Sequence, residues 1–344
     1  MFWKFSAVAE IALAALLKEM VIVSDRAIIP VTLLTGFLGA GKTTLLGKLL
    51  RDPRFSDTAV LVNEFGEIAL DHLLVEAVPD NITIEVTSGC LCCTVRGDLI
   101  RIIEGLMKRK GSFDAIVIET TGLADPAPVA QTFFVDDDVS AKARLDAIVT
   151  VVDAKHLLLR LADSHEAEEQ IAFADVILLN KVDLVSEQEL EEVRQRVRAI
   201  NNQAKLFETV NAEVPLDQVL GLGAFDLDRI LEIEPGFLGE DDHEHDQSIT
   251  SVSVSSQTEV LPEKFMPWLR QLTARQGVDI LRLKGIIAFP GEAERYVVQG
   301  VHMLLDGNTQ RKWKEDEPRI SRLVFIGRNL DQEALARGFA ACAL

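Results

Sequence analysis

The sequence predicts an α/β fold in which a doubly wound, mainly parallel sheet is followed by a smaller α+β domain. Three observations lead to this prediction. Between residues 30 and 225, apolar runs rich in Val, Ile and Leu alternate with helical patterns, which is typical of a parallel sheet covered on both faces. Residues 232–250 carry Pro, Gly and a run of acids, as linkers do. After them, a series of strand patterns with two helical patterns indicates an α+β unit.

The first domain is expected to contain seven strands. The apolar runs that predict them are 31–35, 58–63, 82–86, 113–119, 145–153, 174–180 and 204–210. Because these runs are nearly continuous in Val, Ile and Leu, each strand is expected to be buried on both faces. The clearest helix is expected at 187–200, since Ser186 can cap its first turn and Glu189 stands three residues later.

The second domain is expected to have antiparallel strands with helices on one face. In chain order, the expected elements are strand 248–256, helix 262–276, strands 278–289, 295–305 and 319–327, and helix 331–342. The expected boundaries are therefore 30–231 for the first domain, 232–250 for the linker and 251–344 for the second domain.

Residues 1–29 precede this pattern as an N-terminal extension. Its apolar stretch is interrupted by Glu10 and ends at Lys18 and Glu19, so it is too short to span a bilayer. A signal peptide, a short amphipathic helix and an over-long gene start are the alternatives, and Met20 is a natural start for the first domain. We favour a dispensable extension and leave open whether residues 1–19 belong to the native protein.

The net charge and the positions of the cysteines exclude several classes of protein. The chain has 344 residues and a formal net charge of −19 at pH 7, which argues against nucleic acid and anionic membranes as general partners. Three of the four cysteines fall within four positions. Such bunching differs from the disulfide framework of a secreted domain and is more typical of a metal or catalytic site in a cytoplasmic protein. We therefore expect a cytoplasmic protein.

The stretch GFLGAGKT matches the phosphate-binding pattern G-x-x-x-x-G-K-[ST]. It stands between an expected strand and a helical pattern, where the backbone N–H groups of such a loop can surround phosphate oxygens. Lys42 is expected to reach the β and γ phosphates, and Thr43 to bind Mg²⁺. The expected nucleotide-binding residues of this P-loop are Gly36, Gly39, Ala40, Gly41, Lys42, Thr43 and Thr44.

A carboxylate for the magnesium ion is expected at Glu119. It ends the apolar strand 113–119 and is followed by Gly122. An acid at that point can reach Mg²⁺ directly or through water, and the glycine backbone can approach the γ-phosphate. Most such sites use Asp, so Glu119 is a slight departure. Lys42, Thr43 and Glu119 are the expected catalytic residues, whereas the sequence does not identify the residue that positions the attacking water.

Asn180, Lys181 and Asp183 form an N-K-x-D pattern at the end of an expected strand. A carboxylate at Asp183 can accept the N1–H and the exocyclic amine of guanine, and a base without those donors would leave the carboxylate unpaired. Lys181 is expected to lie along the base and Asn180 to tie this loop to the phosphate loop. Asn211 and Ala212 follow the next strand, where a backbone N–H could reach guanine O6. The predicted nucleotide is GTP, with GDP as the product.

Cys90, Cys92 and Cys93 lie together in the stretch SGCLCC. In an extended segment the first two thiols point to one side, and the third can approach from a turn. Thiolates prefer Zn²⁺ or Cu(I), with Co²⁺ and Ni²⁺ as alternatives. Three protein ligands leave the fourth position of a tetrahedral site open, which suits delivery of a metal ion. Buried or redox-active cysteines are the alternative interpretation.

Four further residues are weaker candidates for metal ligands. Glu64 and Glu67 lie in NEFGE, between the phosphate loop and Glu119. Either acid could complete the metal site or be a solvated loop residue. His243 and His245 lie in the acidic linker, where they could capture a metal ion or simply belong to a solvated segment.

These motifs together resemble the CobW-type metallochaperone GTPases. GFLGAGKTTLL, NEFGE, SGCLCC, ETTGLADP and LLNKVDL occur in the order found in that family, and the likeness extends from about residue 30 to about residue 340. The resemblance implies slow GTP hydrolysis coupled to the binding and transfer of Zn²⁺ or, in some members, of cobalt for cobalamin synthesis. The N-terminal extension and the short tract DDHEHD depart from the family pattern.

We therefore predict a slow, Mg²⁺-dependent GTPase that acts as a metallochaperone, with Zn²⁺ as the cargo and a client metalloprotein as the partner. Hydrolysis is expected to relax the cysteine segment and release the ion. The alternatives are a Co²⁺ chaperone for cobalamin synthesis, a GTP-binding metal buffer or sensor with little turnover, and a P-loop kinase, against which N-K-x-D speaks. A homodimer that forms with metal or with GTP also stays open.

Overall fold

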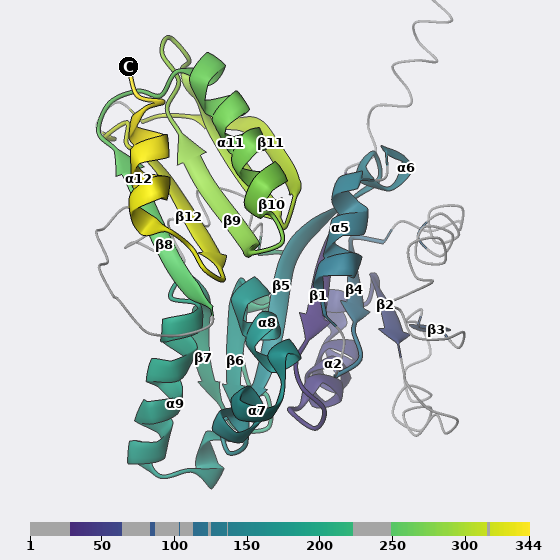
Figure 1. Ribbon diagram of the computed structural model, residues 1–344. Coiled ribbons are helices and arrows are strands. Elements are labelled where there is room, and N and C mark those ends of the chain that lie inside the picture. Colours follow the sequence, from purple (N-terminus) through teal and green to yellow (C-terminus); the bar gives the residue numbers. More distant parts are fainter. Residues whose placement is uncertain are drawn as a thin grey trace, which may run out of the picture.

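Two sheets with their covering helices make up the described part of the chain (Figure 1). The computed structural model describes residues 28–63, 83–86, 103, 113–122, 125–135, 137–222, 249–314 and 317–344. The larger sheet is parallel and the smaller sheet is antiparallel. The predicted fold class, a doubly wound α/β domain with a smaller α+β unit after it, is confirmed.

The larger sheet has seven strands in the order β3-β2-β4-β1-β5-β6-β7. They are β1 (Ile29–Thr35), β2 (Thr58–Asn63), β3 (Thr83–Val86), β4 (Ala115–Glu119), β5 (Ala143–Asp153), β6 (Val176–Asn180) and β7 (Lys205–Thr209). The chain builds β2, β3 and β4 on one side of β1 and then β5, β6 and β7 on the other. The strand order therefore reverses at β1, and doubly wound folds bind ligands at the carboxyl ends of the strands beside such a point.

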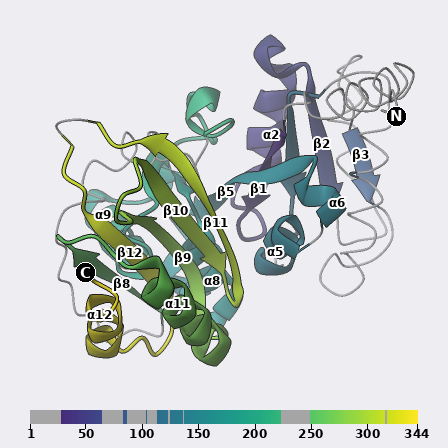
Figure 2. The same cartoon turned by 90° about the horizontal axis from the view of Figure 1, so that it is seen from above.

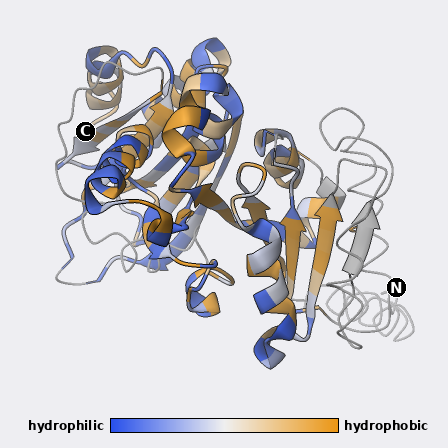
Figure 3. Ribbon diagram, turned by 90° about the horizontal axis from the view of Figure 1, so that it is seen from below, coloured by the Kyte–Doolittle hydropathy of each residue, from blue (hydrophilic) through white to orange (hydrophobic). Residues whose placement is uncertain are grey.

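Helices cover both faces of this sheet, because its strands are apolar on both sides. They are α2 (Lys42–Arg51), α5 (Ala127–Val135), α6 (Asp137–Ser140), α7 (Leu157–Asp163), α8 (His165–Phe173) and α9 (Glu187–Ile200). On β1, Leu33 belongs to a core with α5, α8 and α9, whereas Leu34 belongs to a core with α2. Figure 3 shows the apolar strands of this sheet in orange. Within the described residues, no helix has the length and apolarity needed to cross a membrane.

Helix α9 begins and ends where the sequence predicts. The Ser186 hydroxyl oxygen accepts the Glu189 backbone N–H at 3.3 Å, and the Glu189 carboxylate accepts the Ser186 backbone N–H at 2.8 Å. This reciprocal pair satisfies two N–H groups that the helix start would otherwise leave without a partner. Leu190, Val193 and Val197 pack into the core that α9 shares with α5 and α8.

The smaller sheet has five antiparallel strands in the order β11-β10-β9-β12-β8. They are β8 (Thr250–Ser256), β9 (Ile280–Ile287), β10 (Glu294–Val301), β11 (Leu304–Lys312) and β12 (Ser321–Gly327), and the helices are α11 (Pro262–Gln276) and α12 (Gln332–Ala340). Phe265 of α11 and Phe339 of α12 share one core with Phe325 of β12. Both helices therefore cover the same face of this sheet, as the sequence predicts (Figure 1).

One predicted strand is wrong, because the run 295–305 folds as a hairpin. Strand β10 ends at Val301, which pairs with Leu304 at the start of β11. His302 in the turn between them has a φ of 53°, a conformation that His adopts more readily than most side chains. The sequence conceals this turn, since V-H-M-L-L has no Gly, Asn, Asp or Pro to mark it.

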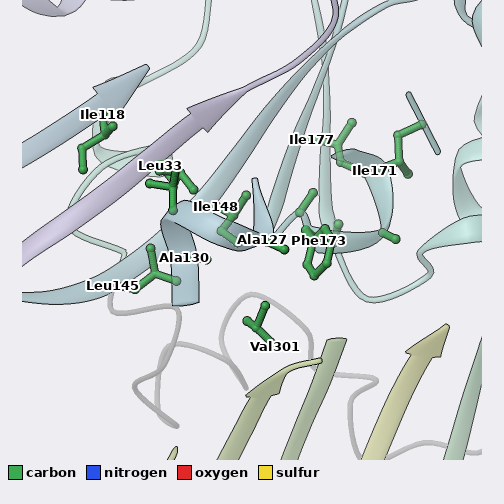
Figure 4. Packing of buried hydrophobic residues seen from close by; sticks show 14 of the residues in the cluster. Leu33, Ile118, Ala127, Ala130, Leu145, Ile148, Ile171, Phe173, Ile177 and Val301 are labelled. Atoms are coloured by element: carbon green, nitrogen blue, oxygen red, sulfur yellow. The ribbon is translucent and has the colours of Figure 1, made fainter. Parts of the chain in front are cut away.

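The two domains pack together through α8 and β9 (Figure 2). Leu281, Val301 and Ile326 come from the smaller sheet but are buried in the core of the larger domain. Figure 4 shows Val301 on the side of the smaller sheet, with Phe173 among the residues above it. The face of the smaller sheet opposite to α11 and α12 is therefore covered by the larger domain.

Candidate functional site

Two glycines let the phosphate loop lie directly against the ends of β5 and β6. Gly36 has a φ of 133°, and a Cβ added there would lie 2.1 Å from the carbonyl oxygen of Val151. Gly41 has a φ of 121°, and its added Cβ would lie 2.5 Å from the amide nitrogen of Asn180. A side chain at either position would be strained and would clash.

Lys42 begins α2 and turns back over the loop. Its side chain is buried, and Nζ donates to the Gly36 carbonyl oxygen at 2.7 Å. Burial lowers the pKa of Lys42, and the Glu119 carboxylate partly offsets this effect. A buried ammonium group at the N-terminal end of a helix fits a bound polyphosphate. The next two residues, Thr43 and Thr44, are half-buried and exposed respectively.

Strand β4 brings Glu119 and Gly122 to the same loop. Glu119 stands opposite Leu34 of β1 and is 7 % exposed. Thr120 continues the pairing, since its N–H donates to the Leu34 carbonyl oxygen at 2.9 Å. A Cβ added at Gly122 would lie 2.5 Å from the backbone nitrogen of Leu38. The Gly122 backbone is therefore so close to the phosphate loop that a residue with a Cβ would clash there.

Asn180 connects the N-K-x-D loop to the phosphate loop. Its Nδ2 donates to the Ala40 carbonyl oxygen at 2.8 Å. Its Oδ1 accepts the Ala212 N–H at 2.8 Å and the Thr209 hydroxyl at 3.1 Å. The side chain is 2 % exposed, so these bonds are shielded from water and hold three loops in a fixed arrangement.

Lys181 and Asp183 lie next to this junction. Lys181 has a φ of 64°, and its Nζ lies 2.7 Å from Oδ2 of Asp153 at the end of β5. The same oxygen lies 3.0 Å from His156 Nδ1. Burial raises the pKa of Asp153, but Lys181 and His156 outweigh this and hold it below its ordinary value. Asp183 is exposed in the short turn η2 (Val182–Leu184).

The pair that follows β7 differs in part from the expectation. Asn211 and Ala212 have φ values of 53° and 52°. The Ala212 N–H, one of the two candidates for a contact to guanine O6, donates instead to Asn180 inside the protein. Ala212 therefore supports the loop, and Asn211 is the candidate that stays.

A cavity of about 240 Å³ adjoins the phosphate loop. Phe37 and Leu38 of the loop, the end of β5, and helices α7 and α8 line it. The Arg160 guanidinium of α7 lies 4.9 Å from the centre of the Phe37 ring, a cation–π contact. Gln170 of α8 also lines this cavity.

Three of these lining residues are not predicted from the sequence: Asp153, Arg160 and Gln170. Asp153 carried a signal, because it ends an apolar strand as Glu119 and Asn180 do, and the carboxyl ends of parallel strands meet at one edge. Arg160 and Gln170 carried none. They lie on helices whose placement over the loop depends on packing rather than on a local pattern.

The predicted nucleotide-binding residues gather at the carboxyl edge of β1, β4, β6 and β7. Those in the described part of the chain are Gly36, Gly39, Ala40, Gly41, Lys42, Thr43, Thr44, Glu119, Gly122, Asn180, Lys181, Asp183 and Asn211. The predicted metal ligands Cys90, Cys92, Cys93, Glu64, Glu67, His243 and His245 lie outside the described residues. Among the residues that are described, no group of three or more His, Cys, Asp or Glu side chains could hold a metal ion.

The two domains match two known domain families. Residues 30–208 match the family described as "CobW/HypB/UreG, nucleotide-binding domain". Residues 249–343 match the family described as "Cobalamin synthesis protein cobW C-terminal domain". The first match alone covers more than half of the chain.

Several proteins that are similar to this chain over most of its length carry zinc-related names. "Zinc chaperone CobW" of Pseudomonas aeruginosa is 37% identical over 90% of this chain and 90% of its own length. "Zinc-regulated GTPase metalloprotein activator 1" of Schizosaccharomyces pombe is 35% identical over 88% of this chain and 83% of its own. The crystal structure of Zn(II)-bound YjiA GTPase from E. coli superposes with a TM-score of 0.73 at 29% identity, covering 93% of this chain and 100% of that chain.

Proposed function

This chain belongs to the CobW/HypB/UreG family of nucleotide-binding proteins, and we propose that it is a GTP-hydrolysing zinc chaperone that passes Zn²⁺ to a client protein. The observation that carries the proposal is the buried Asn180 side chain, which ties a phosphate loop to a guanine-type N-K-x-D loop. The same chain also carries SGCLCC, the candidate metal-binding stretch. The names of the zinc chaperone and of the zinc-regulated GTPase support the same class.

Binding of the triphosphate rests on groups that surround the phosphate loop. Lys42 offers a buried positive charge, which stabilises the β and γ phosphates and the charge that develops as the γ-phosphoryl group leaves. The Gly122 backbone lies against Leu38 of the phosphate loop, which supports its assignment to the γ-phosphate. Its N–H can then orient the group that water attacks.

The oxygen donors near Lys42 suit a magnesium ion. Thr43 offers a hydroxyl and Glu119 a carboxylate, and both lie next to Lys42, whose pKa responds to the Glu119 charge. Hard oxygen ligands of this kind are the ones that Mg²⁺ prefers. When bound, Mg²⁺ would neutralise charge on the β and γ phosphates.

Recognition of the base is assigned to the N-K-x-D loop. Asp183 would accept the two guanine donors, and Lys181, held by Asp153, would lie along the base. Because an adenine base has no matching N1–H donor, the Asp183 carboxylate would be left unpaired with ATP. Asn211 is a weaker candidate for the guanine carbonyl.

The cargo site is assigned to Cys90, Cys92 and Cys93. Three thiolates would supply three of the four ligands of a tetrahedral site, and a client ligand could occupy the fourth place during transfer. Zn²⁺ is favoured over Co²⁺ by the affinity of thiolates. Free thiols so close together also need a reducing compartment, so we assign the protein to the cytoplasm.

The proposal requires that nucleotide and metal influence each other. If Zn²⁺ changes the affinity for GTP by some factor, GTP must change the affinity for Zn²⁺ by the same factor. The test is a titration of GTP with and without Zn²⁺, together with phosphate release under both conditions. Equal affinities and equal turnover would remove the chaperone assignment and leave a GTPase.

A second experiment locates the metal. Replacing Cys90, Cys92 and Cys93 together by Ser is expected to abolish stoichiometric Zn²⁺ binding, because the soft ligands are lost. Cys342→Ser is the matched control, since this fourth cysteine is buried in the smaller domain and donates to the Gly338 carbonyl oxygen. Tight Zn²⁺ binding in the triple variant would place the metal site elsewhere.

A further inference from the structure

Helix α8 carries a buried amide that reaches the turn beside the phosphate loop. Gln170 is 1 % exposed, and its Nε2 donates to the Gly122 carbonyl oxygen at 3.2 Å. The Gln170 backbone oxygen accepts the Thr150 hydroxyl of β5 at 2.7 Å. One residue thus links the helix to the sheet through its backbone and to the turn after β4 through its side chain.

Gly122 needs such a restraint because its backbone has no side chain to limit its conformation. It must be glycine, since any Cβ would meet the backbone of Leu38. Glycine is also the residue with the greatest backbone freedom. The close approach to the phosphate loop requires a residue without a side chain, so no Cβ restricts the orientation of the Gly122 peptide. The hydrogen bond from the Gln170 amide restricts that orientation instead.

We propose that Gln170 is a positioning residue for GTP hydrolysis, which holds the Gly122 backbone in the orientation that meets the γ-phosphate. Gln170 would act through the Gly122 carbonyl oxygen, to which its side chain donates. The inference rests on the GTPase activity and on the assignment of Gly122 to the γ-phosphate. Gln170 belongs to neither the P-loop nor the N-K-x-D motif.

The smaller domain fixes the helix that carries this amide. Arg328 donates to Glu169, the residue before Gln170, at 2.8 Å. At the end of the helix, the rings of Phe173 and His302 meet edge to face with centroids 5.6 Å apart. The helix cannot shift along the sheet without breaking these contacts, so the position of Gln170 depends on both domains.

The first part of the test compares two buried amides. Gln170→Leu removes the donor to Gly122, and kcat is expected to fall about tenfold, as small misplacements in an active site do. The affinity for GDP is expected to stay within about twofold, because GDP has no γ-phosphate for Gly122 to meet. Asn201→Leu is the control. It removes an amide that donates to carbonyl oxygens of Ile171 and Ala174 near the end of the same helix, and kcat is expected to stay within about twofold.

The second part of the test uses a variant whose side chain can donate a hydrogen bond to Gly122 only at low pH. Gln170→Glu has nearly the same shape, but its carboxylate cannot donate a hydrogen bond, whereas its protonated form can. Burial raises the pKa of such an acid. The ratio of variant to wild-type kcat is therefore expected to rise about fivefold or more between pH 8 and pH 6. For Asn201→Leu the same ratio is expected to stay flat.

The outcomes separate this inference from the chaperone proposal. A folded Gln170→Leu variant with wild-type kcat would overturn the inference, as would equal losses of kcat in Gln170→Leu and Asn201→Leu. A flat pH ratio for Gln170→Glu would overturn it even if the leucine variant does not fold. Wild-type GTP hydrolysis that does not respond to Zn²⁺ would remove the chaperone proposal and leave Gln170 in its role.

Discussion

Asp183 is the residue on which the proposed choice of nucleotide depends. It is exposed in η2, directly after Lys181, whose left-handed backbone turns the chain away from β6. Its neighbours in the motif are fixed by buried or half-buried bonds, Asn180 to Ala40 and Lys181 to Asp153. The carboxylate is thus held at the rim of the site by a rigid frame and is free to meet a base.

Asp183→Asn tests this assignment directly. The amide oxygen of the variant can still accept the guanine N1–H, but its amide N–H₂ would face the exocyclic amine of guanine, which is also a donor, and the charged acceptor would be lost. The affinity for GTP is expected to fall by about 100-fold. The affinity for XTP is expected to rise, because xanthine carries a carbonyl oxygen where guanine has its amine. Competition binding against labelled GDP measures both, and an unchanged preference for GTP would contradict the assignment.

At the level of elements, the sequence predicts the larger sheet well because its strands are long apolar runs that end in marked turns. Helix α9 is predicted to the residue, since its start is encoded by Ser186 and Glu189. The hairpin at His302 is missed, because a tertiary contact with Phe173 rather than a turn residue accompanies the reversal. A sequence pattern therefore predicts the elements whose ends are marked by capping or turn residues, and misses ends that depend on tertiary contacts.

The same reasoning explains which parts of the site could be predicted. The phosphate loop and N-K-x-D are contiguous motifs, and Glu119 is marked by its place at a strand end. Gln170 lies 48 residues after Gly122, and Arg160 reaches Phe37 from another helix. Such pairs are set by how helices pack on a sheet, which a single sequence does not specify.

The cap of α9 gives a prediction at this scale. Ser186→Ala removes the side-chain oxygen that accepts the Glu189 N–H, and the free energy of unfolding is expected to fall by about 1 kcal/mol. Ser164→Ala is the matched control. Ser164 stands at the same position before α8 but makes no side-chain cap bond to the backbone, and its hydroxyl donates to the Glu166 carboxylate at 2.6 Å instead, so a change of at most about 0.5 kcal/mol is expected. Urea unfolding measures both, and equal losses would show that the cap bond contributes nothing.

At the level of the whole molecule, Asp175 joins the two domains. It lies between α8 and β6 with its side chain 2 % exposed. Its carboxylate accepts the Ile148 N–H at 2.7 Å and lies 3.1 Å from the Arg282 guanidinium, and Lys284 pairs with the same group. Both cations come from β9 of the smaller domain. A buried carboxylate with several donors of this kind stabilises the interface only as long as it stays ionised.

The acid response of the protein should therefore depend on Asp175. Burial raises its pKa, but Lys284, Arg282 and the Ile148 N–H outweigh this and hold it below its ordinary value. A carboxyl group with a lowered pKa in the folded state stabilises the fold above its unfolded pKa of about 3.9. That contribution is lost as pH falls through the lower folded value. The free energy of unfolding of the wild-type protein is therefore expected to decrease below about pH 4.

Asp175→Asn separates this group from the other carboxylates. At pH 7 the variant leaves Arg282 and Lys284 without this partner, and the free energy of unfolding is expected to fall by about 3–5 kcal/mol. The difference from wild type is expected to shrink as pH falls below about 4, because the contribution of the ionised wild-type group is lost between its unfolded pKa and its lower folded pKa. Glu169→Gln removes a half-exposed partner of Arg328 in the same interface and is expected to change stability by less than about 1 kcal/mol. Urea unfolding of all three proteins over this pH range is the measurement, and a pH-independent difference for Asp175→Asn would show that the charge of Asp175 does not hold the domains together.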